Sequence, residues 1–179
     1  MIPREELILR LLAKLSERLD DPITYTRIQK SIYLLNHFLK QELEKDLGYK
    51  FDGFLAHSGP YDKNLQRDID IWLLLKLLND EGPPLMVEGG PSRFYKTHDL
   101  RITTYGKVYL SDQVAQLLQD YLGKNNLQKI ENYFLELNTK SESELMKSAS
   151  ELWMRQHPEK SKKVEKFVKS FFSENVTVE

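Results

Sequence analysis

The histidines and cysteines of this 179-residue chain are the first side chains to consider for catalysis or metal binding. No two of its four histidines have the spacing of three or four residues that places side chains on one helix face: His37, His57, His98 and His157. A metal site would have to draw them from four separate elements. The chain has no cysteine, which excludes thiolate zinc sites and cysteine nucleophiles within it. We therefore expect no metal site.

Acidic residues concentrate between positions 51 and 83, where a metal-dependent nuclease would need carboxylates on adjoining elements. They are Asp52, Asp62, Asp68, Asp70, Asp80 and Glu81. Asp68 and Asp70 are two apart on an expected helix, so they point away from each other, and a solvated helix face is the better interpretation. The chain has no P-loop, glycine-rich dinucleotide motif or Gly-x-Ser-x-Gly elbow. We therefore expect no catalytic residues, no enzymatic activity and no cofactor.

Basic residues suggest contact with the phosphates of DNA. Between residues 84 and 110 the basic residues exceed the acidic ones by two: Arg93, Lys96, Arg101 and Lys107 against Glu88 and Asp99. The helix expected before this segment carries four side chains that could contact bases in the major groove: Lys63, Asn64, Gln66 and Arg67. The balance of charges over residues 51–83 is −3, however, which opposes the approach of phosphate.

The most distinctive motif is Gly59-Pro60-Tyr61-Asp62. Its structural interpretation is a turn in which Gly59 has a positive φ, Pro60 fixes the next φ, and Asp62 caps a helix. The alternative is a binding surface for an anion or a protein partner, formed by Tyr61 and the free N–H groups of the helix start. We favour the structural interpretation and keep Tyr61 as a candidate partner-binding residue.

The C-terminal segment combines a basic stretch, residues 155–169, with an apolar stripe at helical spacing. The stripe consists of Val164, Phe167, Val168 and Phe171. We expect Phe167 and Phe171 to be covered by the core or by a second subunit, and we favour a symmetric homodimer because this helix is terminal. Acidic residues dilute the positive face, so we do not expect membrane binding.

Stepwise along the chain, hydrophobic spacing predicts a helix that ends at Asp20-Asp21-Pro22 and a second that begins after Thr24 or Thr26 and ends at Gly48. Residues 49–57 are expected to form a strand that runs into a tight turn at Ser58-Gly59-Pro60. A third helix, capped by Asp62, is expected to reach about Asn79, with residues 71–75 deeply buried.

Two extended segments, 85–88 and 92–96, predict a hairpin, and residues 100–103 a further strand. Everything after residue 110 has helical spacing, including a capping box at Ser141 and Glu144. The order helix, helix, strand, helix, hairpin is that of a winged helix. We therefore predict a mainly α protein with a small β-hairpin (α+β). Residues 1–110 would form a winged-helix-like core, and residues 111–179 a helical extension packed on the core or on a second subunit.

Three segments resemble the YwgA-like bacterial and archaeal proteins, the third their C-terminal part, and the first two more distantly resemble the Panacea antitoxin domain. They are Arg27 to Leu35 leading through Phe51–Ala56 into Ser58-Gly59-Pro60-Tyr61, then Leu100 to Lys107, and Glu151 to Glu159. The resemblance implies a winged-helix-like core and regulatory or toxin–antitoxin biology, and it supplies no catalytic residues. The charged segment 40–50 and the polar C-terminal helices depart from the pattern, so a shared partner does not follow.

A dimeric winged-helix DNA-binding (transcriptional) regulator without catalytic activity is the leading hypothesis, with double-stranded DNA as its partner. The alternative is an antitoxin- or adaptor-like protein-interaction module with a toxin-like protein partner. A continuous basic face on the third helix and the wing would favour DNA, and an acidic, partly apolar face would favour a protein. The formal charge of −1, the lack of a membrane-spanning apolar run and an N-terminus without signal-peptide order lead us to expect a cytoplasmic protein.

Overall fold

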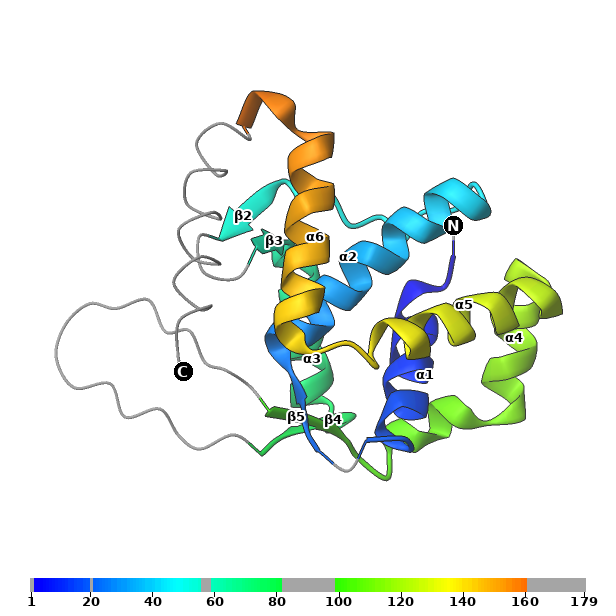
Figure 1. The fold of residues 1–179 in the computed structure, drawn as a ribbon. Helices are drawn as coiled ribbons and strands as arrows, with labels where there is room; N and C mark the ends of the chain where they lie inside the picture. Colours follow the sequence, from blue (N-terminus) through cyan, green and yellow to red (C-terminus); the bar gives the residue numbers. More distant parts are fainter. Residues whose placement is uncertain (1, 20, 56–58, 82–98, 161–179) are drawn as a thin grey trace, which may run out of the picture.

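The computed structural model describes residues 2–19, 21–55, 59–81 and 99–160. The described chain is mostly helical with small antiparallel sheets, which confirms the predicted fold class (Figure 1). Its elements are α1 (Arg4–Ser16), β1 (Ile23–Thr24), α2 (Tyr25–Glu42), β2 (Gly53–Leu55), β3 (Gly59–Tyr61), α3 (Lys63–Leu74), β4 (Leu78–Asp80), β5 (Asp99–Ile102), the 3-10 helix η1 (Gly106–Leu110), α4 (Asp112–Leu122), α5 (Lys124–Leu137) and α6 (Glu142–Gln156).

A three-stranded antiparallel sheet has the order β1-β5-β4. In the centre, β5 pairs Leu100 with Ile23 of β1 and Arg101 with Asn79 of β4. One strand between the first two helices and two strands after the third helix form a single sheet, whereas the sequence placed its first strand between the second and third helices. The further strand predicted at residues 100–103 is confirmed as β5. The two hairpin strands predicted at 85–88 and 92–96 lie outside the described residues.

The third helix is shorter than predicted, because it ends at Leu74 instead of near Asn79. Lys76 has a φ of +56°, which a helix cannot accommodate, and the chain then enters β4. The second helix likewise ends at Glu42, well before Gly48. Both predictions ran too far because apolar or charged residues with good helix propensity continue past the actual ends.

Residues 53–55 and 59–61 pair as a two-stranded antiparallel ribbon, where the sequence predicted one strand and a tight turn. Gly59 and Pro60 belong to β3 and pair with Leu55 and Phe54 of β2. A proline is tolerated there because a two-stranded ribbon leaves one edge unpaired. The predicted positive φ at Gly59 is confirmed at +78°.

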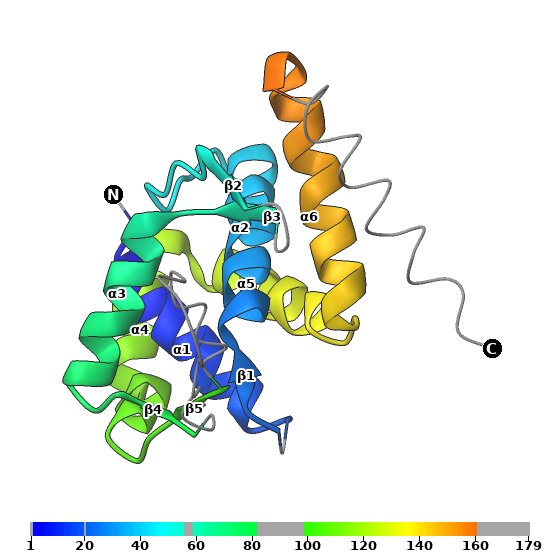
Figure 2. The same cartoon turned by 90° about the vertical axis from the view of Figure 1, so that its left-hand side faces the viewer.

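The core forms around α1 and α2. Helix α1 is buried on more than one side, since Leu7, Leu9 and Leu11 are all enclosed. Helix α5 packs on α1 and α2, while α6 packs on α2 and β3. In Figure 2, α2 stands between α3 on one side and α6 on the other. The described part of the helical extension therefore packs against the first 110 residues of its own chain.

A buried ionic cluster joins α1 to α5. The Glu131 carboxylate accepts a hydrogen bond from Arg10 Nε at 2.8 Å and lies 2.7 Å from Lys14 Nζ. Arg10 also donates to the carbonyl of Tyr109 at 3.2 Å, so one guanidinium connects three elements. Among the described helices, none is long and apolar enough to cross a membrane.

Candidate functional site

Two side chains of α2 bind the backbone of β3 and the residue after it. The Gln29 amide accepts from Asp62 N at 3.2 Å and donates to Asp62 O at 3.1 Å. Lys30 Nζ donates to the carbonyl of Pro60 at 2.7 Å. The helix segment and the Gly-Pro-Tyr motif that carry the family resemblance are therefore in direct contact, which supports the structural interpretation of the motif.

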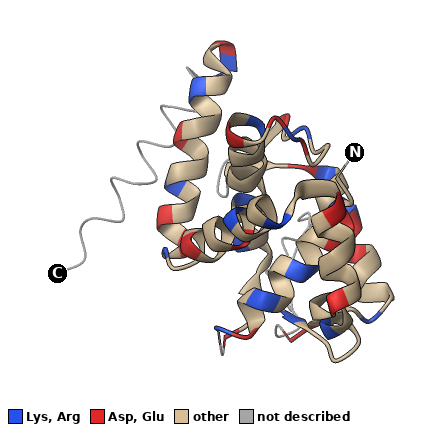
Figure 3. Cartoon of the chain, turned by 90° about the vertical axis from the view of Figure 1, so that its right-hand side faces the viewer, with Lys and Arg blue, Asp and Glu red and all other residues tan. Residues whose placement is uncertain are grey.

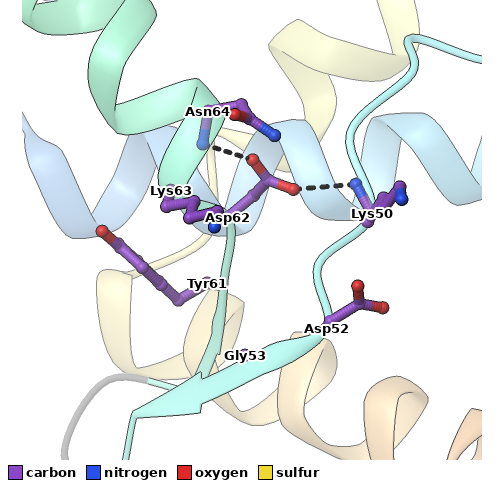
Figure 4. A pocket seen from close by; sticks show the side chains of 7 residues that line it. All are labelled: Lys50, Asp52, Gly53, Tyr61, Asp62, Lys63 and Asn64. Atoms are coloured by element: carbon purple, nitrogen blue, oxygen red, sulfur yellow. Dashed lines mark hydrogen bonds between the residues drawn. The ribbon is translucent and has the colours of Figure 1, made fainter.

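Asp62 occupies the N-terminus of α3 with its own carboxylate. One oxygen accepts from the backbone N–H of Asn64 (2.7 Å) and of Leu65 (3.1 Å). The other accepts from Lys50 (2.7 Å) and Phe51 (3.0 Å), and Figure 4 shows one bond of each pair. The free N–H groups on which an anion site would depend are thus already satisfied, so the alternative interpretation of this helix start loses its basis.

Lys30 is enclosed, with 1% of its surface exposed. Burial lowers the pKa of its ammonium to about 7, and the carboxylate of Glu142 opposes this shift. A lysine with a lowered pKa is often a nucleophile or base. Here no solvent path reaches it, so its role is to hold β3 against α2.

A pocket of about 380 Å³ lies where β2, β3 and the start of α3 meet. Its lining consists of Lys50, Asp52, Gly53, Tyr61, Asp62, Lys63 and Asn64. Tyr61 and Asp52 point in opposite directions in Figure 4. The Tyr61 hydroxyl donates to Gln66, and burial raises its pKa, helped by Asp62 and Asp70. The polar groups do not converge on a common point, so the pocket lacks the arrangement of a catalytic site.

The four predicted base-contacting residues come together on the N-terminal half of α3. Lys63 and Arg67 are exposed, and Asn64 and Gln66 are half-buried. Arg101 lies on β5 and forms an ion pair with Glu81 at 2.9 Å. The other predicted site residues lie outside the described residues: Arg93, Lys96, Phe167 and Phe171.

The position of Asp68 contradicts the prediction of a solvated acidic face on this helix. It is buried, forms an ion pair with Arg4 at 3.0 Å, and accepts from the Tyr49 hydroxyl at 2.7 Å. The Arg4 guanidinium also lies over the Tyr49 ring, 4.6 Å from its centroid. Asp70 is exposed, as predicted. Because Asp62 and Asp68 both face inward, the exposed surface of residues 51–83 is less negative than the sum of −3 over their sequence.

The C-terminal end of α3 exposes large apolar side chains, so the prediction of deep burial for residues 71–75 holds for Trp72 and is wrong for Ile71, Leu74 and Leu75. Leu65, Ile69 and Trp72 face the core, and this spacing turns Leu74 and Leu75 outward, where they are 81% and 62% exposed. The run of apolar residues from 71 to 75 is longer than one helix face can bury. The length of this run could therefore have indicated from the sequence that some of its side chains are exposed.

Two further exposed apolar residues lie at the start of η1, in the segment that contacts the residues following α3: Tyr105 is 74% and Val108 58% exposed. The chain changes direction after α3, at Lys76 and Leu77, and again before η1, at Thr103. Thr103 joins these two corners, because its N–H donates to Leu77 O at 3.0 Å and its hydroxyl to Lys76 O at 2.6 Å. We call Leu74, Leu75, Tyr105 and Val108 the corner patch. No feature of the sequence singled out Tyr105 and Val108, since their proximity to α3 depends on the β4–β5 pairing.

Charges of both signs are interspersed along the helices on the side shown in Figure 3. The part of the chain that the structure describes contains no group of three acidic, histidine or cysteine residues suited to a metal ion. Comparisons with protein-family models, curated proteins and solved structures found no match to this chain.

Proposed function

We propose that the protein is a winged-helix DNA-binding regulator that inserts the N-terminal half of α3 into the major groove. The observation that carries this proposal is that Lys63 and Arg67 are exposed, and Asn64 and Gln66 half-buried, on that half of the helix. In helix-turn-helix proteins the N-terminal residues of the recognition helix contact the base edges. The amides of Asn64 and Gln66 suit adenine, and the cations suit guanine or phosphate.

The electrostatics of α3 support DNA contact better than the sum over the sequence does. Asp62 and Asp68 have buried internal partners, so the exposed charges of α3 are two cations, Lys63 and Arg67, in its N-terminal half and one carboxylate, Asp70, in its C-terminal half. Phosphates approaching this face would meet a small net positive charge, although residues 51–83 sum to −3.

The supports of α3 favour a fixed orientation for this surface. Asp62 accepts four backbone N–H groups at the helix start, and Gln29 fixes the backbone of Asp62 itself. Leu65 and Ile69 anchor the opposite face in the core. A helix held in this way would present its side chains to DNA with little loss of conformational entropy.

A salt-titrated binding assay tests the proposal. Fluorescence anisotropy with a labelled random duplex would compare the wild type with Lys63→Ala/Arg67→Ala. We expect weaker binding and a reduction of about 2 in the slope of log K against log salt, since each phosphate contact contributes about 0.9. Lys124→Ala/Lys129→Ala removes two exposed cations from α5 and serves as a charge-matched control. Equal effects of the two double variants would refute a role for α3, and absence of binding at low salt would refute DNA binding.

The proposal extends to the wing and the C-terminal segment. Arg93 and Lys96 would add phosphate contacts, so Arg93→Ala/Lys96→Ala should lower the salt slope by a similar amount. Phe167 and Phe171 would form a homodimer interface, which light scattering on the full chain and on a chain ending at Pro158 would test. A monomeric full-length chain would rule out the dimer. A regulator of this kind would act in the cytoplasm.

The second candidate function is an antitoxin- or adaptor-like protein-interaction module. The specific observation that favours it is the exposure of large apolar side chains at the C-terminal end of α3 and at η1. These side chains add little to DNA affinity, which depends on charged and polar contacts. The two functions use different residues of one helix and are compatible.

A further inference from the structure

The corner patch lies on two chain segments that contact each other through their backbones, the residues after α3 and the residues around the start of η1. Gly106 lies so close to β4 that a Cβ atom placed on it would be 2.3 Å from the carbonyl oxygen of Leu77. This close approach and the hydrogen bonds of Thr103 hold the two chain corners together. Leu74, Leu75, Tyr105 and Val108 are therefore presented outward on a rigid base. Contiguous apolar surface on such a base typically marks an interaction site.

The charges on the same two corners indicate what would bind there. Lys76 follows Leu75 and Lys107 precedes Val108, and both are exposed. The nearby exposed carboxylates are Asp70, one turn back along α3, and Asp112, at the start of α4. The lysines are thus the charged residues adjacent in sequence to the apolar ones, and they add exposed positive charge to the corner patch.

This positive charge favours an acidic partner over a second copy of this chain or a membrane. Two copies joined symmetrically through the corner patch would bring Lys76 and Lys107 of both copies into one interface, where like charges repel. Attraction to an anionic membrane requires a larger cluster of basic residues than two. An acidic protein segment satisfies the apolar residues and the lysines together.

We propose that the corner patch binds a protein segment that presents apolar side chains flanked by carboxylates, as one side of an acidic amphipathic helix does. The apolar side chains would cover Leu74, Leu75, Tyr105 and Val108, and the carboxylates would pair with Lys76 and Lys107. This inference deepens the second candidate function by naming its surface and the chemistry of its partner. It does not depend on DNA binding.

A synthetic 20-residue helix, with leucine on one face and glutamate on the flanks, is the probe. We expect the labelled peptide to bind the full-length protein in an anisotropy titration and a peptide with lysine in place of glutamate to bind at least about tenfold more weakly. Leu74→Ser/Val108→Ser should weaken binding by about tenfold or more, since each leucine or valine contributes buried apolar area. Leu117→Ser/Tyr121→Ser, which alters two exposed apolar residues of α4, is the matched control and should bind normally.

Charge reversal gives a second, independent readout. Lys76→Glu/Lys107→Glu should lose the glutamate peptide and gain the lysine peptide. Circular dichroism and thermal melting would establish that all variants fold. We expect them to fold because the substituted side chains are exposed. The two serine variants, which change no charge, should retain the DNA affinity conferred by Lys63 and Arg67, so a failed DNA assay and a failed peptide assay are distinguishable.

Any one of three results would overturn the proposal. They are no binding of the glutamate peptide, equal binding of both peptides, and unchanged binding by the Leu74→Ser/Val108→Ser variant. Sedimentation that shows a dimer lost in this variant would assign the patch to a second copy. Flotation with phosphatidylserine vesicles, also lost in this variant, would assign it to a membrane.

Discussion

Replacing Gly59 with alanine should destabilise the fold through two separate costs. Gly59 has a φ of +78°, a conformation that costs a residue with a Cβ about 1–2 kcal/mol. The new Cβ atom would also lie 2.7 Å from Ser150 Oγ, closer than atoms can approach, and 3.6 Å from Lys30 Cε. Ser150 is buried in α6, so moving its hydroxyl off its rotamer costs about 1 kcal/mol more. We expect Gly59→Ala to lower the free energy of unfolding by about 2–3 kcal/mol.

Urea denaturation followed by circular dichroism would measure this loss, and a double-mutant cycle would divide it. Ser150→Ala removes the hydroxyl, so the pair Gly59→Ala/Ser150→Ala should recover the contact cost and retain the backbone cost. Gly123→Ala provides a second comparison, because Gly123 has a φ of +81° while the nearest atom to its new Cβ, in the Asn126 side chain, is 3.9 Å away. It should show the backbone cost alone.

Two outcomes would refute this reasoning. A Gly59→Ala protein as stable as the wild type would mean that β3 adapts and that the glycine is not required by its φ. A double variant no more stable than Gly59→Ala would mean that the Ser150 hydroxyl is not the group that limits the space. In either case the motif would need an explanation at the surface of the protein.

Two buried charges give further predictions. Lys30→Met should flatten the pH dependence of stability between about pH 7 and 10: burial lowers the pKa of folded Lys30 to about 7, whereas the unfolded lysine holds its proton to about pH 10.4. The unfolded state binds more protons in that window, so the free energy of unfolding rises with pH. In the wild type this rise exceeds that of the variant by up to about 1.4 kcal/mol per pH unit. Parallel urea-derived curves for the two proteins would contradict this. Glu131→Gln should cost about 3–5 kcal/mol, because it leaves the Arg10 guanidinium buried without its partner. The exposed control Glu136→Gln should change stability by less than about 0.5 kcal/mol, and a similar loss from both would refute the role of the cluster.

Local signals in the sequence located the helix starts well. Asp62 and Ser141 each cap a helix as predicted, and Thr24, one of the two predicted alternatives, caps α2, because a capping side chain acts within three residues of itself. The capping box of Ser141 with Glu144 is confirmed in both of its hydrogen bonds. Such interactions depend only on neighbouring residues, so they can be recognised without knowledge of the fold.

Long-range contacts were beyond the same reasoning. Strand β1 has two residues and shows no alternation, and its pairing with β5 joins Ile23 to Leu100 across most of the core. The burial of Asp68 depends on Arg4, 64 positions away, so its spacing from Asp70 suggested a solvated face. The same difference between local signals and long-range contacts applies to the candidate site. The helix that carries Lys63 and Arg67 could be predicted, whereas the inward orientation of Asp68 and the joining of Tyr105 to Leu74 could not.

The two proposed surfaces share one short helix, and that closeness has a consequence for their use together. Arg67 and Leu74 are seven positions apart on α3, which at 1.5 Å per residue is about 10 Å along the axis. This is close to the Debye length of about 8–10 Å at physiological salt, so carboxylates bound beside Lys76 would lie within range of phosphates bound beside Arg67. The acidic peptide and DNA should therefore weaken each other's binding. In a competition titration we expect the glutamate peptide to lower DNA affinity at low salt and the effect to fade as salt is raised. Independent binding at low salt would show that the two halves of α3 are electrostatically separate.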